Sequence, residues 1–245
     1  LPDGNFICPM KPKDDKYPYS DAAYAIITPE GEIISQHSIS RVLLEHGYVG
    51  LVLGVGPCEG DRMHLNDVEP INESDKWVQK GDLMISLRNL STVLLYRPDE
   101  DRILWLSTGP WLNQHDVDYQ GNGVFSVFGN NSIRNPNNRS IIDSYYYYEN
   151  SEIYTYDMKN GAISAPFEKV FESEPLIAYS QGLHRILENG DAFVSMTNSG
   201  RLLRVSPKQV RWRFVSSIDE GLIGALHWSR YFSRGELNLD WMKHD

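Results

Sequence analysis

The stretch that decides the fold reads NQHDVDYQGNGVFSVFGNN and covers residues 113–131. Polar residues mark a Gly-Asn-Gly turn in its middle, and a mostly apolar run, residues 124–128, follows the turn. This pattern predicts two short antiparallel strands joined by a hairpin turn. The same plan returns three more times along the chain, so we expect repeats that meet at a shared centre. His115 opens the first strand, and we expect it to do chemistry at that centre.

The repeated feature is a glycine turn followed by an apolar strand. It occurs at residues 3–7, 80–85, 122–125 and 189–194. A second hairpin of alternating character follows each turn, at residues 24–34, 93–105, 153–163 and 202–212. A further strand precedes three of the turns, at residues 64–71, 115–120 and 181–188. Each unit therefore predicts a four-stranded antiparallel sheet whose first strand lines a central channel, which favours a β-propeller over a β-sandwich as the all-β fold.

The first and last repeats are incomplete. The chain opens on the turn at residues 1–5, and residues 224–232 resemble a first strand with no others after it. These two halves would complete one sheet and close a ring, which removes exposed edges. Alternatively, N-terminal blades are missing from this chain or are supplied by another chain. Because about four blades is the low end for propellers, we expect residues 1–245 to form one propeller domain that lacks N-terminal blades and belongs to a larger, six-bladed propeller.

Composition and charge argue against some classes of partner. The 245-residue chain carries a formal net charge of −10, which is unfavourable for binding nucleic acid. It contains no run of about 18 apolar residues, so we expect no membrane span. The two cysteines, Cys8 and Cys58, are too few for a disulfide scaffold, and they either form one bridge or are both small buried side chains.

Three further segments depart from the repeats. Residues 39–51 show a short helical period, and no other stretch shows a sustained one. Residues 54–61 and 130–148 are long loops, and loops of this length are often functional. The second loop ends in four tyrosines, residues 145–148, which either wall a pocket for an aromatic group or form an adhesive surface.

Four histidines lie on the predicted inner strands: His64, His115, His184 and His227. Strands that line one channel bring such residues together. Arg88 follows a second strand, near the same end of the channel as His64. Each histidine alone is also explained as a hydrogen-bonded structural residue, but four at equivalent positions point to a site. We expect His184 and His227 to contact the substrate.

Clustered histidines also suit zinc or another transition metal, which would make the protein a metal-dependent hydrolase. The sequence shows no paired carboxylates for such a site, and a cation such as Arg88 beside a metal ion is unfavourable. We therefore expect no metal and no cofactor. The other alternative is a non-catalytic propeller that acts as a binding or structural module.

Three motifs occur in a fixed order along the chain. They are Met63-His64-Leu65-Asn66-Asp67-Val68, then residues 81–91 with Ser86-Leu87-Arg88-Asn89, then residues 109–116 with Gln114-His115. Together they resemble the arylsulfotransferases, a family of bacterial propeller enzymes. The resemblance implies PAPS-independent transfer of a sulfuryl group from an aryl sulfate to a phenol through a sulfated histidine. It also implies a periplasmic or secreted location.

The resemblance assigns roles to residues of this chain. His115 matches the family's nucleophile, and three residues match those that hold the sulfuryl oxygens: His64, Asn66 and Arg88. The family has a further histidine just before a Leu-Pro-Asp-Gly turn, and this chain begins at that turn. The implied partners are a small aryl sulfate and a phenol.

These residue types suit the implied chemistry. A transferring sulfuryl group carries spread negative charge, so catalysis depends on positioning and on charge stabilisation. Arg88 offers a rigid fork of donors, neutral His115 is a competent nucleophile, and His64 can move the phenol's proton. The rate should fall as the pH drops through the pKa of the nucleophile, about 6.5 for an unperturbed histidine. Strand alternation predicts that Asp116 points away from the channel if His115 points into it.

Overall fold

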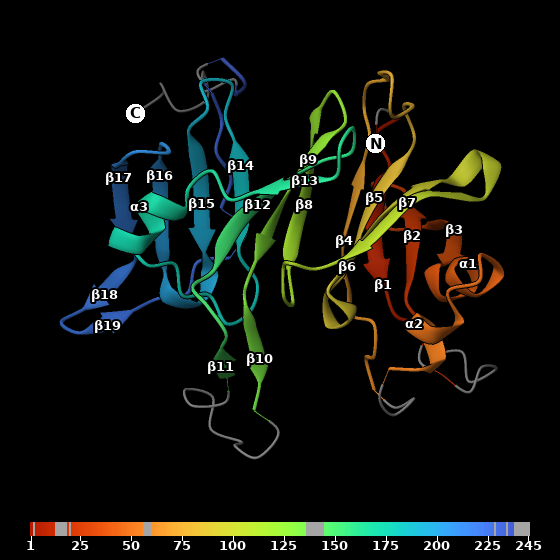
Figure 1. Ribbon diagram of the computed structural model, residues 1–245, viewed down its shortest axis with the longest axis horizontal. Helices are drawn as coiled ribbons and strands as arrows, with labels where there is room; N and C mark the ends of the chain where they lie inside the picture. The colour runs from red at the N-terminus through yellow and green to blue at the C-terminus, as the bar shows by residue number, and fades with distance from the viewer. Residues whose placement is uncertain are drawn as a thin grey trace.

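The computed structural model describes residues 1, 3–12, 19, 21–55, 60–135, 145–227, 229–233 and 235–237. Within these residues the strands form one three-stranded sheet, three four-stranded antiparallel sheets and two short hairpins. Figure 1 shows that the sheets follow one another in chain order, from the red N-terminal sheet to the blue C-terminal one. We number them sheets 1 to 4 in this order.

Sheet 1 contains β1 (Phe6–Met10), β2 (Ala23–Ile27) and β3 (Ile33–Ser38). Sheet 2 contains β4 (Leu65–Pro70), β5 (Leu83–Leu87), β6 (Thr92–Arg97) and β7 (Arg102–Thr108). Sheet 3 contains β8 (His115–Gly121), β9 (Val124–Gly129), β12 (Glu152–Asp157) and β13 (Ala162–Ser164). Sheet 4 contains β14 (Leu183–Ile186), β15 (Ala192–Met196), β16 (Arg201–Val205) and β17 (Val210–Val215).

The first strand of each four-stranded sheet lies at its inner edge. β8 contacts β4 on one side and β14 on the other, and β4 in turn contacts β1. These strands are the segments predicted at residues 64–71, 115–120 and 181–188, and their predicted place as neighbouring inner strands of successive sheets is confirmed. The predicted all-β fold with propeller-like four-stranded sheets is also confirmed.

Three apolar clusters fill the three interfaces between neighbouring sheets. Sheets 1 and 2 enclose side chains that include Tyr24, Leu43, Ile85 and Leu94. Sheets 2 and 3 enclose Met84, Leu95, Trp111, Phe125 and Val127, among others. Sheets 3 and 4 enclose Ile153, Phe167, Phe171, Val194 and Leu203, among others. Because β5 is buried on both faces, its sequence does not alternate, and all of its residues except Ser86 are apolar.

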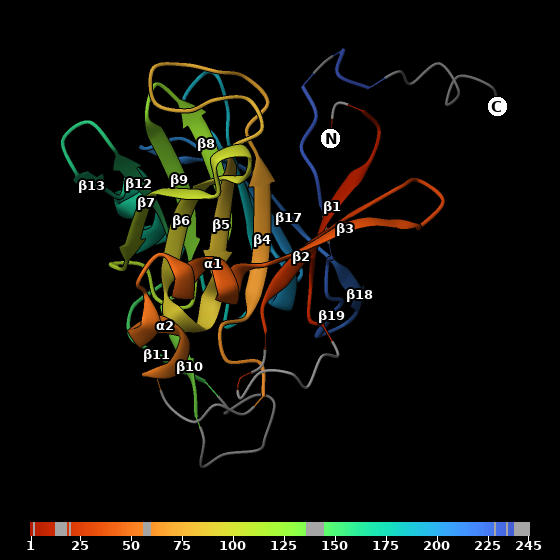
Figure 2. The same cartoon turned by 90° about the vertical axis from the view of Figure 1, so that its right-hand side faces the viewer.

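Three short helices accompany the sheets. The segment predicted as helical at residues 39–51 forms α1 (Ile39–Glu45) and α2 (Val49–Leu53), which Figure 2 shows beside sheets 1 and 2. The side chain of Ser38 accepts a hydrogen bond from the backbone N–H of Arg41 and so caps the start of α1. The sequence did not predict α3 (Glu168–Ser173), which is shorter than two turns and packs between sheets 3 and 4.

Two hairpins lie outside the four sheets. The tyrosine-rich loop contains one, formed by β10 (Ser132–Arg134) and β11 (Tyr145–Tyr147), and it projects from the lower end of the molecule in Figure 1. Its Tyr145 ring stacks on the Tyr179 ring at 4.8 Å between centroids. The other hairpin, β18 (Ser217–Asp219) and β19 (Leu222–Ile223), follows sheet 4.

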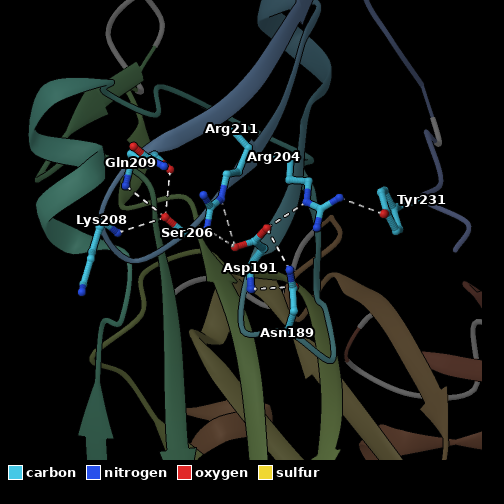
Figure 3. Close-up of polar contacts among 8 residues, drawn as sticks. All are labelled: Asn189, Asp191, Arg204, Ser206, Lys208, Gln209, Arg211 and Tyr231. Atoms are coloured by element: carbon cyan, nitrogen blue, oxygen red, sulfur yellow. Dashed lines mark hydrogen bonds and ion pairs between the residues drawn. The ribbon is translucent and has the colours of Figure 1, made fainter.

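In two of the sheets, an aspartate that follows the glycine turn makes hydrogen bonds with an arginine of the same sheet. Asp82 accepts hydrogen bonds from Arg97 Nε at 2.7 Å and Nη2 at 2.8 Å. The equivalent residue of sheet 4, Asp191, accepts from Arg204 Nε at 2.9 Å, and Figure 3 shows Arg211 and Asn189 on the same carboxylate. Each pair fixes the turn of one strand to the strand that follows it, so the repeated Gly-Asp pair has a structural role.

The end of the described chain corrects one expectation. Residues 224–227 and 229–233 contain no strand, so they do not complete sheet 1 as an inner strand. The segment instead lies against sheet 4, where Arg185 Nη1 donates to the backbone oxygen of Tyr231 at 2.8 Å. Arg204 Nη1 donates to the Tyr231 hydroxyl at 3.1 Å, as Figure 3 shows. These side-chain bonds attach the segment to sheet 4.

No described helix is long and apolar enough to cross a membrane. Cys8 is half-buried on β1, and its possible partner Cys58 lies outside the described residues, as does any bridge between them. The extent of the domain and the missing N-terminal blades stay predictions.

The Asp82–Arg97 pair gives a test of the fold. Asp82 is 1% exposed and Arg97 is 10% exposed, so Arg97→Gln leaves a buried carboxylate without its partner. We expect this to lower the free energy of unfolding by about 3–5 kcal/mol. Arg102→Gln, which removes an exposed ion pair with Glu100, should cost only about 0–1 kcal/mol. Urea denaturation measures both, and similar losses for the two variants would contradict this role of the buried pair.

Candidate active site

The inner strands β4 and β8 each contain a bulge at the start. In β4, Leu65 and Asp67 pair with consecutive residues of β5, so Asn66 is the extra residue. In β8, His115 and Val117 likewise pair with consecutive residues of β9, and Asp116 is the extra residue, with φ of 53°. A bulge breaks the alternation of side chains along a strand. His115 and Asp116 therefore both line the channel, and the expectation that Asp116 points away is wrong.

A cavity of about 660 Å³ lies between the inner strands and the C-terminal segment. Five of the predicted site residues line it: His64, Asn66, His115, His184 and His227. The sixth, Arg88, lies beside them, because its backbone N–H donates to the backbone oxygen of His64 at 3.0 Å. The structure thus brings together residues that lie far apart in the chain, from His64 to His227.

The His115 ring is fixed in one tautomer by Asn130. The Asn130 amide nitrogen donates to the backbone oxygens of Ala178 at 2.9 Å and Gln181 at 2.7 Å, so its oxygen faces the imidazole. His115 Nδ1 lies 2.7 Å from this oxygen and must be the protonated nitrogen. Nε2 then carries the lone pair, and from the described part of the chain it accepts a single long bond, 3.2 Å, from the backbone N–H of Gln181.

Burial lowers the pKa of His115 to about 3. Burial is the largest cause of this value, the nearby Arg88 and His64 also contribute to the lowering, and the hydrogen bond to Asn130 opposes it. The imidazole is therefore neutral across the physiological range. The expected decline in rate near pH 6.5 moves to a far more acidic pH for this group.

His64 and Asn66 lie at the start of β4. His64 is 41% exposed and has a positive φ of 51°, and its Nδ1 lies 2.7 Å from Asp61 Oδ2. Asn66 Nδ2 donates to the backbone oxygen of Gln114 at 2.8 Å, which joins β4 to the residue before β8. Its Oδ1 is buried and accepts no hydrogen bond from the described residues.

Arg88 follows β5 directly and is half-buried. Its Nη1 donates to Asn89 Oδ1 at 2.7 Å. Burial lowers the pKa of its guanidinium, while Tyr145 and Asp61 raise it. An arginine stays charged in proteins, so this residue supplies a permanent positive charge close to His64 and His115.

His184 has both ring nitrogens in internal hydrogen bonds. Nδ1 lies 2.9 Å from Asp116 Oδ2, and Nε2 lies 2.6 Å from Ser126 Oγ. Gln120 Nε2 donates to the same hydroxyl at 2.8 Å, so the network is complete. Because its side chain is fully buried, the geometry favours a bracing role over the predicted contact with substrate. His227 is exposed on the C-terminal segment, and its role stays a prediction.

Four carboxylates gather along the channel: Asp67, Glu69, Asp116 and Asp118. The sequence-based view that paired carboxylates are absent is therefore wrong, because β4 and β8 each contribute two and lie side by side. Burial and the neighbouring carboxylates raise the pKa of Asp118 to about 7 and that of Glu69 to about 8. Burial also raises the pKa values of Asp67 and Asp116, and Arg230 opposes all four shifts.

Among the described residues, one group has the spacing of a metal site. Ligand atoms of Asp116, Asp118 and His184 lie within 4.8 Å of one another. However, the two nitrogens of His184 already bond Asp116 and Ser126, and Asp116 also accepts the backbone N–H of His184. A metal ion would have to replace these bonds, so the residues fit a metal centre poorly.

Sequence reasoning missed two residues that hold the candidate site. Asn130 directly follows the apolar strand β9, and its position after Gly129 gave no sign of the tautomer it imposes on His115. Asp61 lies in the loop before β4, three residues ahead of His64, and that spacing is the only signal that could have indicated it.

The raised pKa values of the channel carboxylates can be tested through the pH dependence of protein stability. A carboxyl group with a higher pKa in the folded than in the unfolded protein stabilises the fold at low pH, and this contribution is lost as the pH rises through the folded pKa. Unperturbed histidines are neutral above about pH 6.5, so we expect the free energy of unfolding to fall from there to about pH 9. Glu69→Gln with Asp118→Asn should remove much of this fall.

The control is Glu73→Gln with Asp99→Asn, two exposed carboxylates. Urea midpoints at several pH values measure the dependence for both double variants. An equal pH dependence in both double variants would contradict the assigned pKa values.

Comparisons with known proteins complete the description of the site. No curated protein sequence matches the chain. A protein of unknown function from Bacteroides caccae is similar in structure, with a TM-score of 0.48 and 13% identity over 87% of this chain and 64% of that one. A luciferin-regenerating enzyme has a TM-score of 0.44 and 15% identity, over 83% of this chain and 61% of that one. A virginiamycin B lyase from Staphylococcus aureus has a TM-score of 0.38 and 10% identity, over 86% of this chain and 74% of that one.

The chain thus spans less than two thirds of the length of the Bacteroides caccae protein. At these identities the structural similarities say nothing about activity. A sequence-family comparison is more informative. The model of the arylsulfotransferase (ASST) family matches residues 6–216, well over half of the sequence, and the chain belongs to this family.

Proposed function

We propose that the chain transfers a sulfuryl group from an aryl sulfate to a phenolic acceptor, with His115 as the nucleophile. The state of its imidazole supports this most directly. Nδ1–H is engaged by Asn130, and the pKa lowered to about 3 by burial leaves Nε2 unprotonated, with its lone pair, at neutral pH. Nucleophilic attack by histidine requires this unprotonated nitrogen. Among the described residues, the long bond from Gln181 is the hydrogen bond that Nε2 must give up.

In the first half-reaction, His115 Nε2 attacks the sulfur of the aryl sulfate. The N–S bond forms while the S–O bond to the aryl group breaks, and the phenolate leaves with the bonding electrons. Negative charge spreads over the three sulfuryl oxygens. Arg88 and Asn66 supply N–H donors to these oxygens, and Arg88 adds a fixed positive charge.

In the second half-reaction, the oxygen of the acceptor phenol attacks the sulfur of the sulfated histidine. The new S–O bond forms as the S–N bond breaks, and the electron pair returns to His115 Nε2. The phenol's proton passes to His64, which later releases it to solvent. Two displacements at one nitrogen replace a single direct transfer.

The proposal extends to the setting of the reaction. A partner chain or a further segment completes the propeller, and the protein works in the periplasm or is secreted. Donor and acceptor are both small aromatic molecules. A non-catalytic binding module is the outcome that the experiments below would show if transfer fails.

The first test is the covalent step. After incubation with 4-nitrophenyl sulfate and rapid quenching, mass spectrometry should find an increase of about 80 Da on the peptide that contains His115. His115→Asn should abolish this adduct and the ping-pong turnover, and not merely raise KM. Because burial lowers the pKa of the imidazole to about 3, the rate of adduct formation should not fall between about pH 8 and pH 5.

His46→Asn is the matched control, since this histidine bonds the backbone oxygen of Val42 in α1, far from the cavity. Nitrophenol release that survives His115→Asn would rule out this nucleophile. Binding of the aryl sulfate without any release by the unmodified protein would favour the binding module.

Arg88 gives the second test. Calorimetry should show that Arg88→Ala binds sulfate at least about tenfold more weakly, which corresponds to about 1.4 kcal/mol. Arg88→Lys should recover only part of the affinity, because an ammonium lacks the planar fork. Arg102→Ala, at an exposed site 55% open to solvent, serves as the control. Sulfate affinity that is the same in Arg88→Ala and the unmodified protein would remove Arg88 from the site.

A further inference from the structure

The carboxylate of Asp61 makes two separate hydrogen bonds with His64. Its Oδ1 accepts the backbone N–H of His64 at 3.2 Å, and its Oδ2 lies 2.7 Å from the ring Nδ1. A carboxylate accepts hydrogen bonds, so the proton of the neutral ring lies on Nδ1 and the lone pair on Nε2. The first bond fixes the backbone at its positive φ of 51°, and the second fixes the plane and the tautomer of the ring.

Asp61 is also tied to Arg88. Asn89 Nδ2 donates to the backbone oxygen of Asp61 at 2.7 Å, and Asn89 Oδ1 accepts from Arg88 Nη1 at 2.7 Å. The backbone N–H of Asn89 donates to the oxygen of Met63 at 3.1 Å. Asp61 and Asn89 together therefore fix the position of His64 relative to Arg88.

We propose that Asp61 is a positioning residue that makes His64 the base for the acceptor phenol. This inference rests on the proposed function and adds a residue that the family motifs do not contain. His64 lines the same cavity as His115, and the Asp61–Asn89 pair ties it to Arg88 of the same site. A base at this place can reach a phenol that approaches the sulfated His115.

The step balances as follows. The phenol O–H bond breaks, and its proton bonds to His64 Nε2. The phenol oxygen forms the bond to sulfur while the N–S bond breaks, and His115 Nε2 recovers its electron pair. The negative charge of Asp61 stabilises the resulting imidazolium, which then gives its proton to solvent.

A purely structural role for Asp61 makes a different prediction. If the residue only caps the backbone turn, its loss should affect every acceptor equally. If it orients a base, its loss should affect only phenols that arrive protonated. A phenol with a pKa of about 10, like that of a tyrosine side chain, needs the base at neutral pH, and a nitrophenol that is already ionised does not.

The experiment uses the full chain with the sulfated histidine formed beforehand from 4-nitrophenyl sulfate. After removal of excess donor, phenol or an ionised dinitrophenol is added, and quenched mass spectrometry follows loss of the adduct. Asp61→Asn can still accept the backbone bond but presents an amide N–H to the ring, which favours the wrong tautomer. We expect at least about a tenfold slower transfer to phenol and an unchanged rate with the dinitrophenol. Asp61→Glu should restore part of the rate with phenol.

Asp157→Asn is the matched control, because Asp157 caps a turn by accepting the backbone N–H of Lys159 at 2.8 Å and lies outside the site. Equal slowing with both acceptors in Asp61→Asn, or no slowing with either, would overturn the proposal. Absence of any adduct on the unmodified protein would instead refute the proposed function. In that case nitrogen-15 NMR of the His64 ring tests the orienting role. The role is overturned if the proton of the neutral ring is not on Nδ1 in the unmodified protein. It is also overturned if the proton stays on Nδ1 in Asp61→Asn.

Discussion

The carboxylate of Asp67 accepts the backbone N–H of Val117 at 2.8 Å, and that of Asp116 accepts the backbone N–H of His184. An inner strand has no neighbour in its own sheet on the channel side, so its buried N–H groups need other partners. Bulges increase this need because they leave an extra residue unpaired. These carboxylate bonds meet it, and they join β4 to β8 and β8 to β14. The relative position of the strands that carry the candidate site depends on them.

Using carboxylates for this purpose has an electrostatic consequence. Four of them crowd one channel, and burial raises their pKa values, to about 7 for Asp118 and about 8 for Glu69. The channel is therefore much less negative near neutral pH than its composition implies. Arg230 also faces this cluster, and Arg88 adds a positive charge beside His64 and His115. A protein with a net charge of −10 can thus offer a local environment suited to a sulfate ester.

The sequence was informative where a residue type recurs at a fixed place in the repeat. Glycine turns and apolar runs located the inner strands, and the histidines on those strands reached one cavity. The bulge at Asp116 could not be predicted, because register depends on the partner strand and not on β8 alone. The partners of the two site histidines, Asn130 and Asp61, lie in connecting segments that no periodic pattern describes. The prediction of a first strand at residues 224–232 failed for a related reason, because hydrogen bonds from side chains of sheet 4 fix the position of this segment.

The two site histidines differ in the groups that hold their Nδ1 atoms, and this difference separates their chemistry. His115 is buried and bonds the neutral amide of Asn130. A carboxylate in that place would favour the imidazolium, which has no lone pair for attack on sulfur. His64 is partly exposed and bonds the carboxylate of Asp61, whose negative charge can stabilise the imidazolium that forms when the ring takes the phenol's proton. An amide therefore suits the nucleophile and a carboxylate suits the base. Exchanging the two partners would weaken both functions while leaving both histidines in place.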